Sequence, residues 1–171
     1  MSRGGVVAIV ITTGVLVLFL TETLAWLNNY FEGFKYPGAL YSVNYFEDLL
    51  IGSGFYIGVT IVWLLVNKYF FFSITQAFVT YGFFGIFLEQ SGAIFRLATE
   101  TLKSNPAFAL FMILFVFLVH GSILGLIHLR LAPRFTGSRR TIWKYPLAII
   151  AIWIGVFFGT AFSSLLSKIV F

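Results

Sequence analysis

Cysteine is absent from this chain of 171 residues, and charged residues make up only 10% of it. Without cysteine the chain forms no disulfide, no iron–sulfur cluster, no thiolate zinc site and no covalently attached haem. Two histidines are present, which are too few to hold zinc by themselves. The sequence therefore predicts no metal site.

Apolar and aromatic residues take the place of the missing charge. Apolar residues, aromatic ones included, make up 60% of the chain, and aromatic residues alone make up 20%, with 22 phenylalanines. The mean hydropathy is +0.98. A soluble domain is about 45–50% apolar and about 25% charged. One globule of this size cannot bury that many apolar side chains and still cover its surface. The composition predicts an integral membrane protein and excludes a soluble enzyme, a nucleic-acid-binding protein and a disordered tail.

Five apolar stretches approach the roughly 20 residues that a membrane-spanning helix needs. The first resembles a signal peptide, but its apolar run continues to Leu27 without a small-residue cleavage site, so we expect an uncleaved helix. The third is uncharged from Phe70 to Leu88. We predict an all-α fold, one transmembrane domain over residues 1–171, with spans over 6–28, 49–66, 70–95, 106–130 and 142–167.

Basic residues indicate the orientation of this polytopic bundle. With five spans and the N-terminus inside, seven Lys and Arg face the cytoplasm and four face outward. The strongest signal is the inner basic loop 131–141, in which Arg134, Arg139 and Arg140 are expected to contact anionic lipid headgroups. A four-span arrangement would place this cluster and Lys68 on opposite sides. We therefore predict N-in and C-out, with an outer aromatic loop over 29–48 in the headgroup layer or capping the bundle.

Small residues recur at four-residue spacing in three of the predicted helices. This spacing lets helix backbones approach closely in a membrane. We interpret it as packing within the bundle, and a docking face for another membrane protein is the alternative. The residues are Gly54, Gly58, Gly121, Gly125, Gly155, Gly159 and Ser163.

Two glutamates inside the predicted spans are the candidate ion or proton site. Glu22 and Glu89 both fall in the outer third of the bilayer, counted at 1.5 Å per residue. Glu32, Glu47 and Asp48 would line the mouth of such a site, and Arg96 lies two helical turns after Glu89 as a counter-ion. Two close carboxylates would share a proton or hold a cation. The alternative is that both glutamates reach the interface or bond to neighbouring helices as structural contacts.

His120 is the candidate cofactor ligand. It lies in the inner third of its helix, far from the glutamates, and Gly121 beside it would leave room for a flat ring. One histidine can serve as a single axial ligand to haem or chlorophyll. The alternative is a histidine bonded to a carbonyl or hydroxyl group of the next helix. We predict no cofactor.

No catalytic motif is present: the chain has no HExxH, no P-loop and no serine nucleophile elbow. We therefore expect no catalytic activity and a role as a non-catalytic integral membrane subunit, in an energy-converting or oxidase-type assembly for example. Its partners would be other membrane subunits and lipid, in the plasma membrane or an energy-converting membrane. The alternatives are a small cation- or proton-coupled transporter or channel, and a protein that binds haem or chlorophyll through one histidine.

Overall fold

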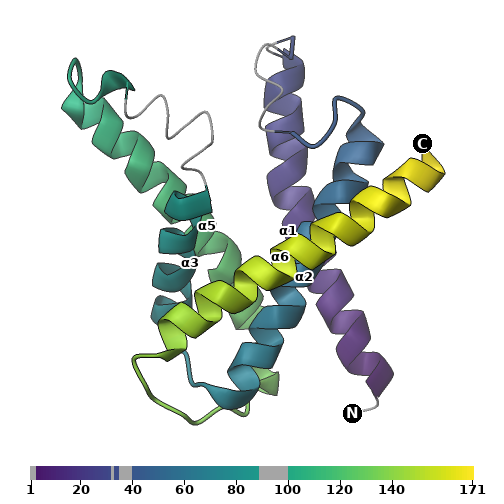
Figure 1. Cartoon of the computed structure of the whole chain (residues 1–171), viewed down its shortest axis with the longest axis vertical. Helices are drawn as coiled ribbons and strands as arrows, with labels where there is room; N and C mark the ends of the chain where they lie inside the picture. The colour runs from purple at the N-terminus through teal and green to yellow at the C-terminus, as the bar shows by residue number, and fades with distance from the viewer. Residues whose placement is uncertain (1–2, 32, 35–39, 89–99) are drawn as a thin grey trace. The chain divides into compact units, whose positions relative to one another are not determined.

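The computed structural model describes residues 3–31, 33–34, 40–88 and 100–171, and this part of the chain is helical (Figure 1). Four of its helices are long and apolar enough to cross a membrane. The fifth, α3, has 15 residues and is shorter than a typical span. The helices are α1 (Arg3–Phe31), α2 (Tyr45–Tyr69), α3 (Ile74–Leu88), α5 (Pro106–Leu131) and α6 (Lys144–Val170), with a short 3₁₀ helix, η3 (Ala132–Arg134), before α6.

Helix α2 begins at Tyr45, four residues before the predicted start, because Asn44 caps it. The side-chain oxygen of Asn44 accepts hydrogen bonds from the backbone N–H of Phe46 at 3.0 Å and of Glu47 at 3.4 Å. The acidic residues Glu47 and Asp48 lie in the first turn, where the helix dipole favours negative charge. Helix α1 continues to Phe31. Both helices therefore extend into the stretch predicted as the outer aromatic loop, and the connection between them is shorter than predicted.

Helix α3 begins at Ile74 rather than near Phe70. The backbone that follows α2 pairs with a later loop instead: Gly137 N–H donates to Asn67 O at 2.8 Å, and Phe71 N–H donates to Arg139 O at 3.1 Å. Ser73 and Gln76 then form a reciprocal capping pair at the start of α3. Helix α3 therefore begins four residues after the predicted start of the third span. The last part of that predicted span, residues 89–95, lies outside the described residues.

The chain divides into two compact units. Unit 1 comprises residues 1–71 and 130–171, and unit 2 comprises residues 72–129. The single transmembrane domain expected over residues 1–171 stays a prediction.

In unit 1, α2 packs against both α1 and α6. Gly14 of α1 lies against Ile57, and Glu22 further along α1 lies against Gly52, which is earlier in α2. The residue numbers change in opposite directions, so α1 and α2 are antiparallel. The same reasoning makes α2 and α6 antiparallel, because Gly54 meets Gly159 and Gly58 meets Gly155.

Glycine determines how closely α2 and α6 approach. A Cβ atom built on Gly54 would overlap the carbonyl oxygen of Gly159, and one built on Gly58 would overlap that of Gly155. Ser163 adds a bond across the same contact, since its hydroxyl donates to Ile51 O at 2.8 Å. Figure 1 shows α6 crossing α2 at this contact. We call it the glycine seam, formed by Gly54, Gly58, Gly155, Gly159 and Ser163.

In unit 2, α3 and α5 also meet through glycine. Phe117 of α5 lies over Gly82, and Phe78 of α3 lies over Gly121. The rings of Phe78 and Phe117 contact each other edge to face, with centroids 5.7 Å apart. At both glycines the backbone carbonyl of the facing phenylalanine also comes close, so α3 and α5 approach through backbone as well as through aromatic rings.

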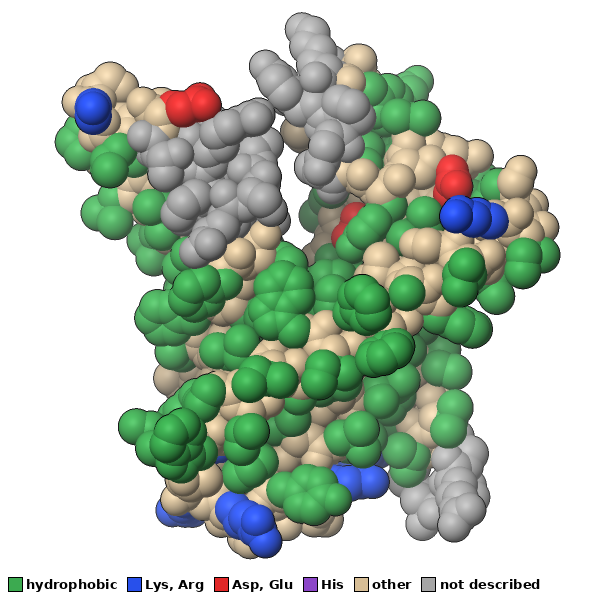
Figure 2. All heavy atoms as spheres, viewed as in Figure 1, with side chains coloured by type: hydrophobic (Ala, Val, Ile, Leu, Met, Phe, Trp, Pro, Cys, Tyr) green, Lys and Arg blue, Asp and Glu red, His purple; other side chains and the backbone are tan. Residues whose placement is uncertain are grey.

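Charge in unit 1 is divided between the two ends of its helices. Basic residues lie where α2 ends and α6 begins, and Figure 2 shows Lys and Arg side chains gathered there below a broad hydrophobic surface. The acids Glu22, Glu47 and Asp48 lie at the opposite end, late in α1 and early in α2, and Lys168 lies at that end too, in the last turn of α6. An apolar body with charge kept to its ends is typical of a membrane-embedded helical unit.

Candidate functional site

Glu22 of α1 is buried against α2, with only 9% of the side chain exposed. Its Oε1 accepts a hydrogen bond from the hydroxyl of Tyr56 at 2.9 Å. The side chain fits into a notch that Gly52 leaves in α2: a Cβ atom built on Gly52 would lie 3.2 Å from Glu22 Cγ. The sequence identified Glu22 but not Tyr56, which is one aromatic residue among many.

Asp48 is the second acid at this end of unit 1, and it is completely buried. Its Oδ1 accepts from the backbone N–H groups of Tyr41 at 2.8 Å and Ser42 at 3.2 Å. Its other oxygen, Oδ2, is buried and has no hydrogen-bond donor among the described residues. The sequence placed Asp48 only at the mouth of a glutamate site, whereas the structure buries it one helical turn before Gly52, the residue that contacts Glu22.

A single stripe on α2 creates this arrangement. Asp48, Gly52 and Tyr56 are spaced by four residues, so they share one face of the helix. That face is turned toward Glu22, since both Gly52 and Tyr56 contact it. The four-residue spacing was visible in the sequence, but it carries meaning only once Glu22 is placed opposite.

Aromatic rings surround the same end of unit 1. The indole N–H of Trp26 donates to Val43 O at 3.1 Å, which ties α1 to the connection before α2. Trp26 also stacks on Tyr30 and meets Tyr45 edge to face, with centroid distances of 5.3 Å and 5.1 Å. Thr23 and Tyr45 add a hydrogen bond of 3.1 Å between their hydroxyls. These contacts hold the two helix ends together beside the carboxyls.

The predicted partners of Glu22 cannot be placed in this site. Glu89 and Arg96 both lie outside the described residues. The pairing of Glu22 with Glu89, with Arg96 as counter-ion, therefore stays a prediction. Among the described acids, Asp48 lies on the face of α2 whose Gly52 and Tyr56 contact Glu22.

His120 of α5 is half-buried and packs within unit 2. Its Nδ1 lies 3.0 Å from Val116 O, one turn earlier in the same helix. The ring lies against Gly85 and is 6.0 Å from the ring of Tyr81. The space that Gly121 was expected to offer to a flat cofactor is taken by Phe78. The neighbourhood of His120 in unit 2 is therefore filled by side chains of α3.

The basic loop is held to the end of α2 by several contacts. The backbones of Phe70 and Arg139 form an isolated β-bridge, and the guanidinium of Arg140 lies 4.8 Å from the centre of the Phe71 ring. Lys144 donates from Nζ to Phe71 O at 2.7 Å. Arg139 and Arg140 are exposed, whereas Arg134 is half-buried.

The remaining predicted packing residues separate into two groups. Gly54, Gly58, Gly155 and Gly159 face one another in the glycine seam, together with Ser163. Gly121 lies under Phe78, and Gly125 has only the edge of that ring nearby, 3.9 Å from a Cβ atom built on it.

Within the part of the chain that the structure describes, no group of three or more His, Cys, Asp or Glu could hold a metal ion. The comparisons with protein-family models, curated proteins and solved structures find no match for this chain.

Proposed function

We propose that the chain is a non-catalytic integral membrane subunit that packs against helices of other membrane proteins. The observation that carries the proposal is the uncovered side of α1. The most apolar stretches of α1 and α6 are 28% and 22% buried, compared with 56% for α2, although the three are similarly hydropathic. Such a helix has one face used inside unit 1 and the rest available to lipid or to a neighbouring protein.

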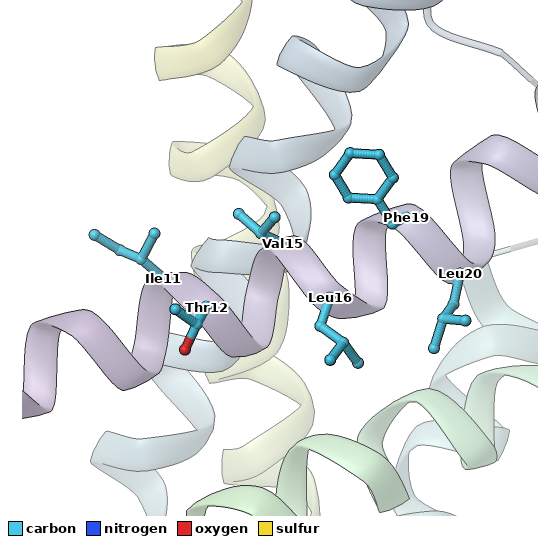
Figure 3. A pocket seen from close by; sticks show the side chains of 6 residues that line it. All are labelled: Ile11, Thr12, Val15, Leu16, Phe19 and Leu20. Carbon is cyan, nitrogen blue, oxygen red and sulfur yellow. The ribbon is translucent and has the colours of Figure 1, made fainter.

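A shallow, open groove runs along this uncovered side of α1. The residues that line it all come from this one helix (Figure 3). The lining residues recur at three- and four-residue steps, the spacing at which the ridge of one helix fits the groove of another. They are Ile11, Thr12, Val15, Leu16, Phe19 and Leu20.

The glycine seam argues for α1 as the docking side. Glycine ridges are typical helix-docking faces in membranes, but here Gly54 and Gly58 are already covered by Gly159 and Gly155. A partner helix therefore has to use another surface, and the groove on α1 offers one in unit 1.

We further propose five spans with the N-terminus inside and the C-terminus outside. The contacts of Gly137 and Arg139 with the end of α2 support this count, because they bring the start of α6 to the side where α2 ends. The chain between α2 and α6 must then cross the membrane an even number of times. Since α5 is long enough to span, the proposal assigns the second crossing to the part of the chain that contains α3.

Anionic lipid is the proposed partner of the basic loop on the inner side. Arg139 and Arg140 are exposed, and the neighbouring Ile142 and Trp143 are 78% and 69% exposed. Apolar side chains beside cations suit the boundary between acyl chains and anionic headgroups. We expect Arg139→Gln with Arg140→Gln to reduce the anionic phospholipid that copurifies with the protein, measured by lipid mass spectrometry. An unchanged lipid content would contradict this role.

The subunit proposal is tested by extraction in a lipid-preserving polymer, with a photoreactive amino acid at Leu16. We expect stoichiometric membrane partners and a protein adduct at Leu16. A photoreactive residue at Phe157, exposed on α6, is the matched control and should give lipid adducts. A chain that is isolated alone, with only lipid adducts at Leu16, would refute the proposal.

The span count is tested separately with single cysteines, because the chain has none of its own. Ser104 and Ser138 are both exposed, and Ser104→Cys and Ser138→Cys are treated with an impermeant thiol reagent. We expect Ser104→Cys to react from outside and Ser138→Cys from the cytoplasm. Labelling of both from the same side would overturn the five-span arrangement.

A further inference from the structure

The buried carboxyls of Glu22 and Asp48 are unusual because they lie at the same end of unit 1 without a basic partner among the described residues. Glu22 is 9% exposed and Asp48 is fully buried. Neither forms an ion pair with a described Lys or Arg, and both belong to the contact in which Gly52 and Tyr56 of α2, one and two turns after Asp48, meet Glu22. Two like charges in a poorly solvated place repel strongly, so this arrangement favours a state with one charge fewer.

The hydrogen bonds around the two acids are incomplete in a specific way. Tyr56 donates to Glu22 Oε1 at 2.9 Å. The two donors to Asp48, Tyr41 N–H and Ser42 N–H, both go to Oδ1. Asp48 Oδ2 is left as a buried acceptor without a donor among the described residues. A buried oxygen in this condition costs free energy unless a donor is supplied.

The local packing is built to hold Glu22 in this place. Gly52 lies between Asp48 and Tyr56 on the same face of α2, and the side chain of Glu22 occupies the room that its missing Cβ leaves. A Cβ atom at position 52 would crowd two side chains of α1, with Leu18 Cδ1 at 3.0 Å and Glu22 Cγ at 3.2 Å. The site therefore consists of two carboxyls, one hydroxyl and the notch that brings them together.

We propose that Glu22 and Asp48 form a proton-binding site in which the two carboxyls hold one proton between them, with Tyr56 as a positioning residue. The bound proton converts one carboxylate to a carboxyl group, which removes one negative charge from the pair and adds a hydrogen-bond donor. Aspartic-protease dyads follow the same physical rule, since neighbouring carboxylates that cannot both ionise share a proton.

A proton fits this site better than a metal cation does. Hard divalent cations take six or more oxygen ligands. The described side chains that meet here offer two carboxyls, one of whose oxygens is already occupied by two backbone donors, and one hydroxyl. The site goes beyond the proposed function, because a subunit that only packs against partners needs no titratable group in α1.

The test is infrared difference spectroscopy of the full chain in lipid nanodiscs during a pH titration. A protonated carboxyl group has a C=O band that a carboxylate lacks. We expect one such band to titrate, and to be lost in both Glu22→Gln and Asp48→Asn. Glu47→Gln is the matched control: Glu47 is the neighbour of Asp48 and bonds to the Ser42 hydroxyl at 2.6 Å, and this variant should keep the band.

Tyr56→Phe distinguishes a positioning role from a purely structural one. Loss of the hydroxyl should move the frequency of the shared band while the far-UV circular dichroism stays that of the wild type. Three results would overturn the proposal: no titrating band in the folded wild type, a band that survives in either acid variant, or a midpoint that Na⁺ or Mg²⁺ displaces at constant ionic strength. The last result would identify a cation site instead. The outcome of this test does not depend on whether protein partners are found at α1, so it can fail independently of the proposed function.

Discussion

Alanine in place of Gly54 is the sharpest test of how unit 1 is held together. The added methyl group would overlap the carbonyl oxygen of Gly159 and the hydroxyl oxygen of Ser163. Backbone cannot rotate out of the way as a side chain can, so α2 and α6 must separate. Separation also weakens the Ser163 to Ile51 hydrogen bond of 2.8 Å.

The expected magnitude follows from three terms. Overpacking costs about 1–3 kcal/mol, and a hydrogen bond between membrane helices contributes about 0.6 kcal/mol. Alanine regains about 1 kcal/mol over glycine through helix propensity. Because the overlapped atoms of Gly159 are backbone, overpacking should fall near its upper end. We expect Gly54→Ala to lower the free energy of unfolding by about 1–3 kcal/mol.

Gly125→Ala is the matched control for this prediction. It gains the same helix propensity, but its Cβ atom would have only ordinary contact, 3.9 Å from the Phe78 ring. Unfolding by sodium dodecyl sulfate in mixed micelles, followed by far-UV circular dichroism, measures both variants. We expect Gly125→Ala to be at least as stable as the wild type. If Gly54→Ala changes stability by the same amount as Gly125→Ala, then the close approach of α2 and α6 is not what stabilises unit 1.

Three further variants test other contacts. Asn44→Ala should lower the free energy of unfolding by about 1 kcal/mol because it removes the cap of α2. Asn44→Asp keeps a hydrogen-bond acceptor and should be less destabilised. Equal losses of stability in thermal unfolding would contradict the cap. Gly85→Ala should destabilise the protein by about 1–3 kcal/mol because its methyl group would overlap the His120 ring. In a double-mutant cycle, His120→Ala in the Gly85→Ala background should restore much of the lost stability. If the losses of the two single variants simply add, the contact is refuted. Lys144→Met should lower the free energy of unfolding by about 1–3 kcal/mol, because it leaves the backbone carbonyl of Phe71 without its donor. Arg139→Met, whose side chain is exposed in the same loop, should change the unfolding midpoint little.

The membrane character of the chain was predictable because it depends on local composition. A run of apolar residues has a favourable transfer free energy into lipid whatever it packs against. The predicted spans over 49–66 and 106–130 therefore correspond to α2 and α5 with shifts of a few residues. The beginning of α3 was not predictable in the same way, because it depends on pairing between Phe70 and Arg139, residues far apart in the sequence.

The candidate site was predictable only in part. Glu22 was identifiable because an acid within an apolar helix is costly and therefore informative. The role of Tyr56 was not identifiable, because a tyrosine in a phenylalanine-rich chain carries no special signal. The complete burial of Asp48 was not identifiable either. The pairings of Glu22 with Glu89 and of either with Arg96 stay predictions, as do the functional hypotheses built on His120.

The sequence by itself determined that this is an all-helical chain with several helices fit to cross a membrane, where its cations gather, and which residues are too polar or too small to be ordinary lipid-facing positions. These properties belong to single residues and short windows. The tertiary structure alone decided the partners: Gly54 with Gly159, Glu22 with Tyr56 and Asp48, and Phe78 in the space beside Gly121. Partners depend on which face each helix turns toward its neighbour and at what register, and these are set by the packing of whole helices against one another.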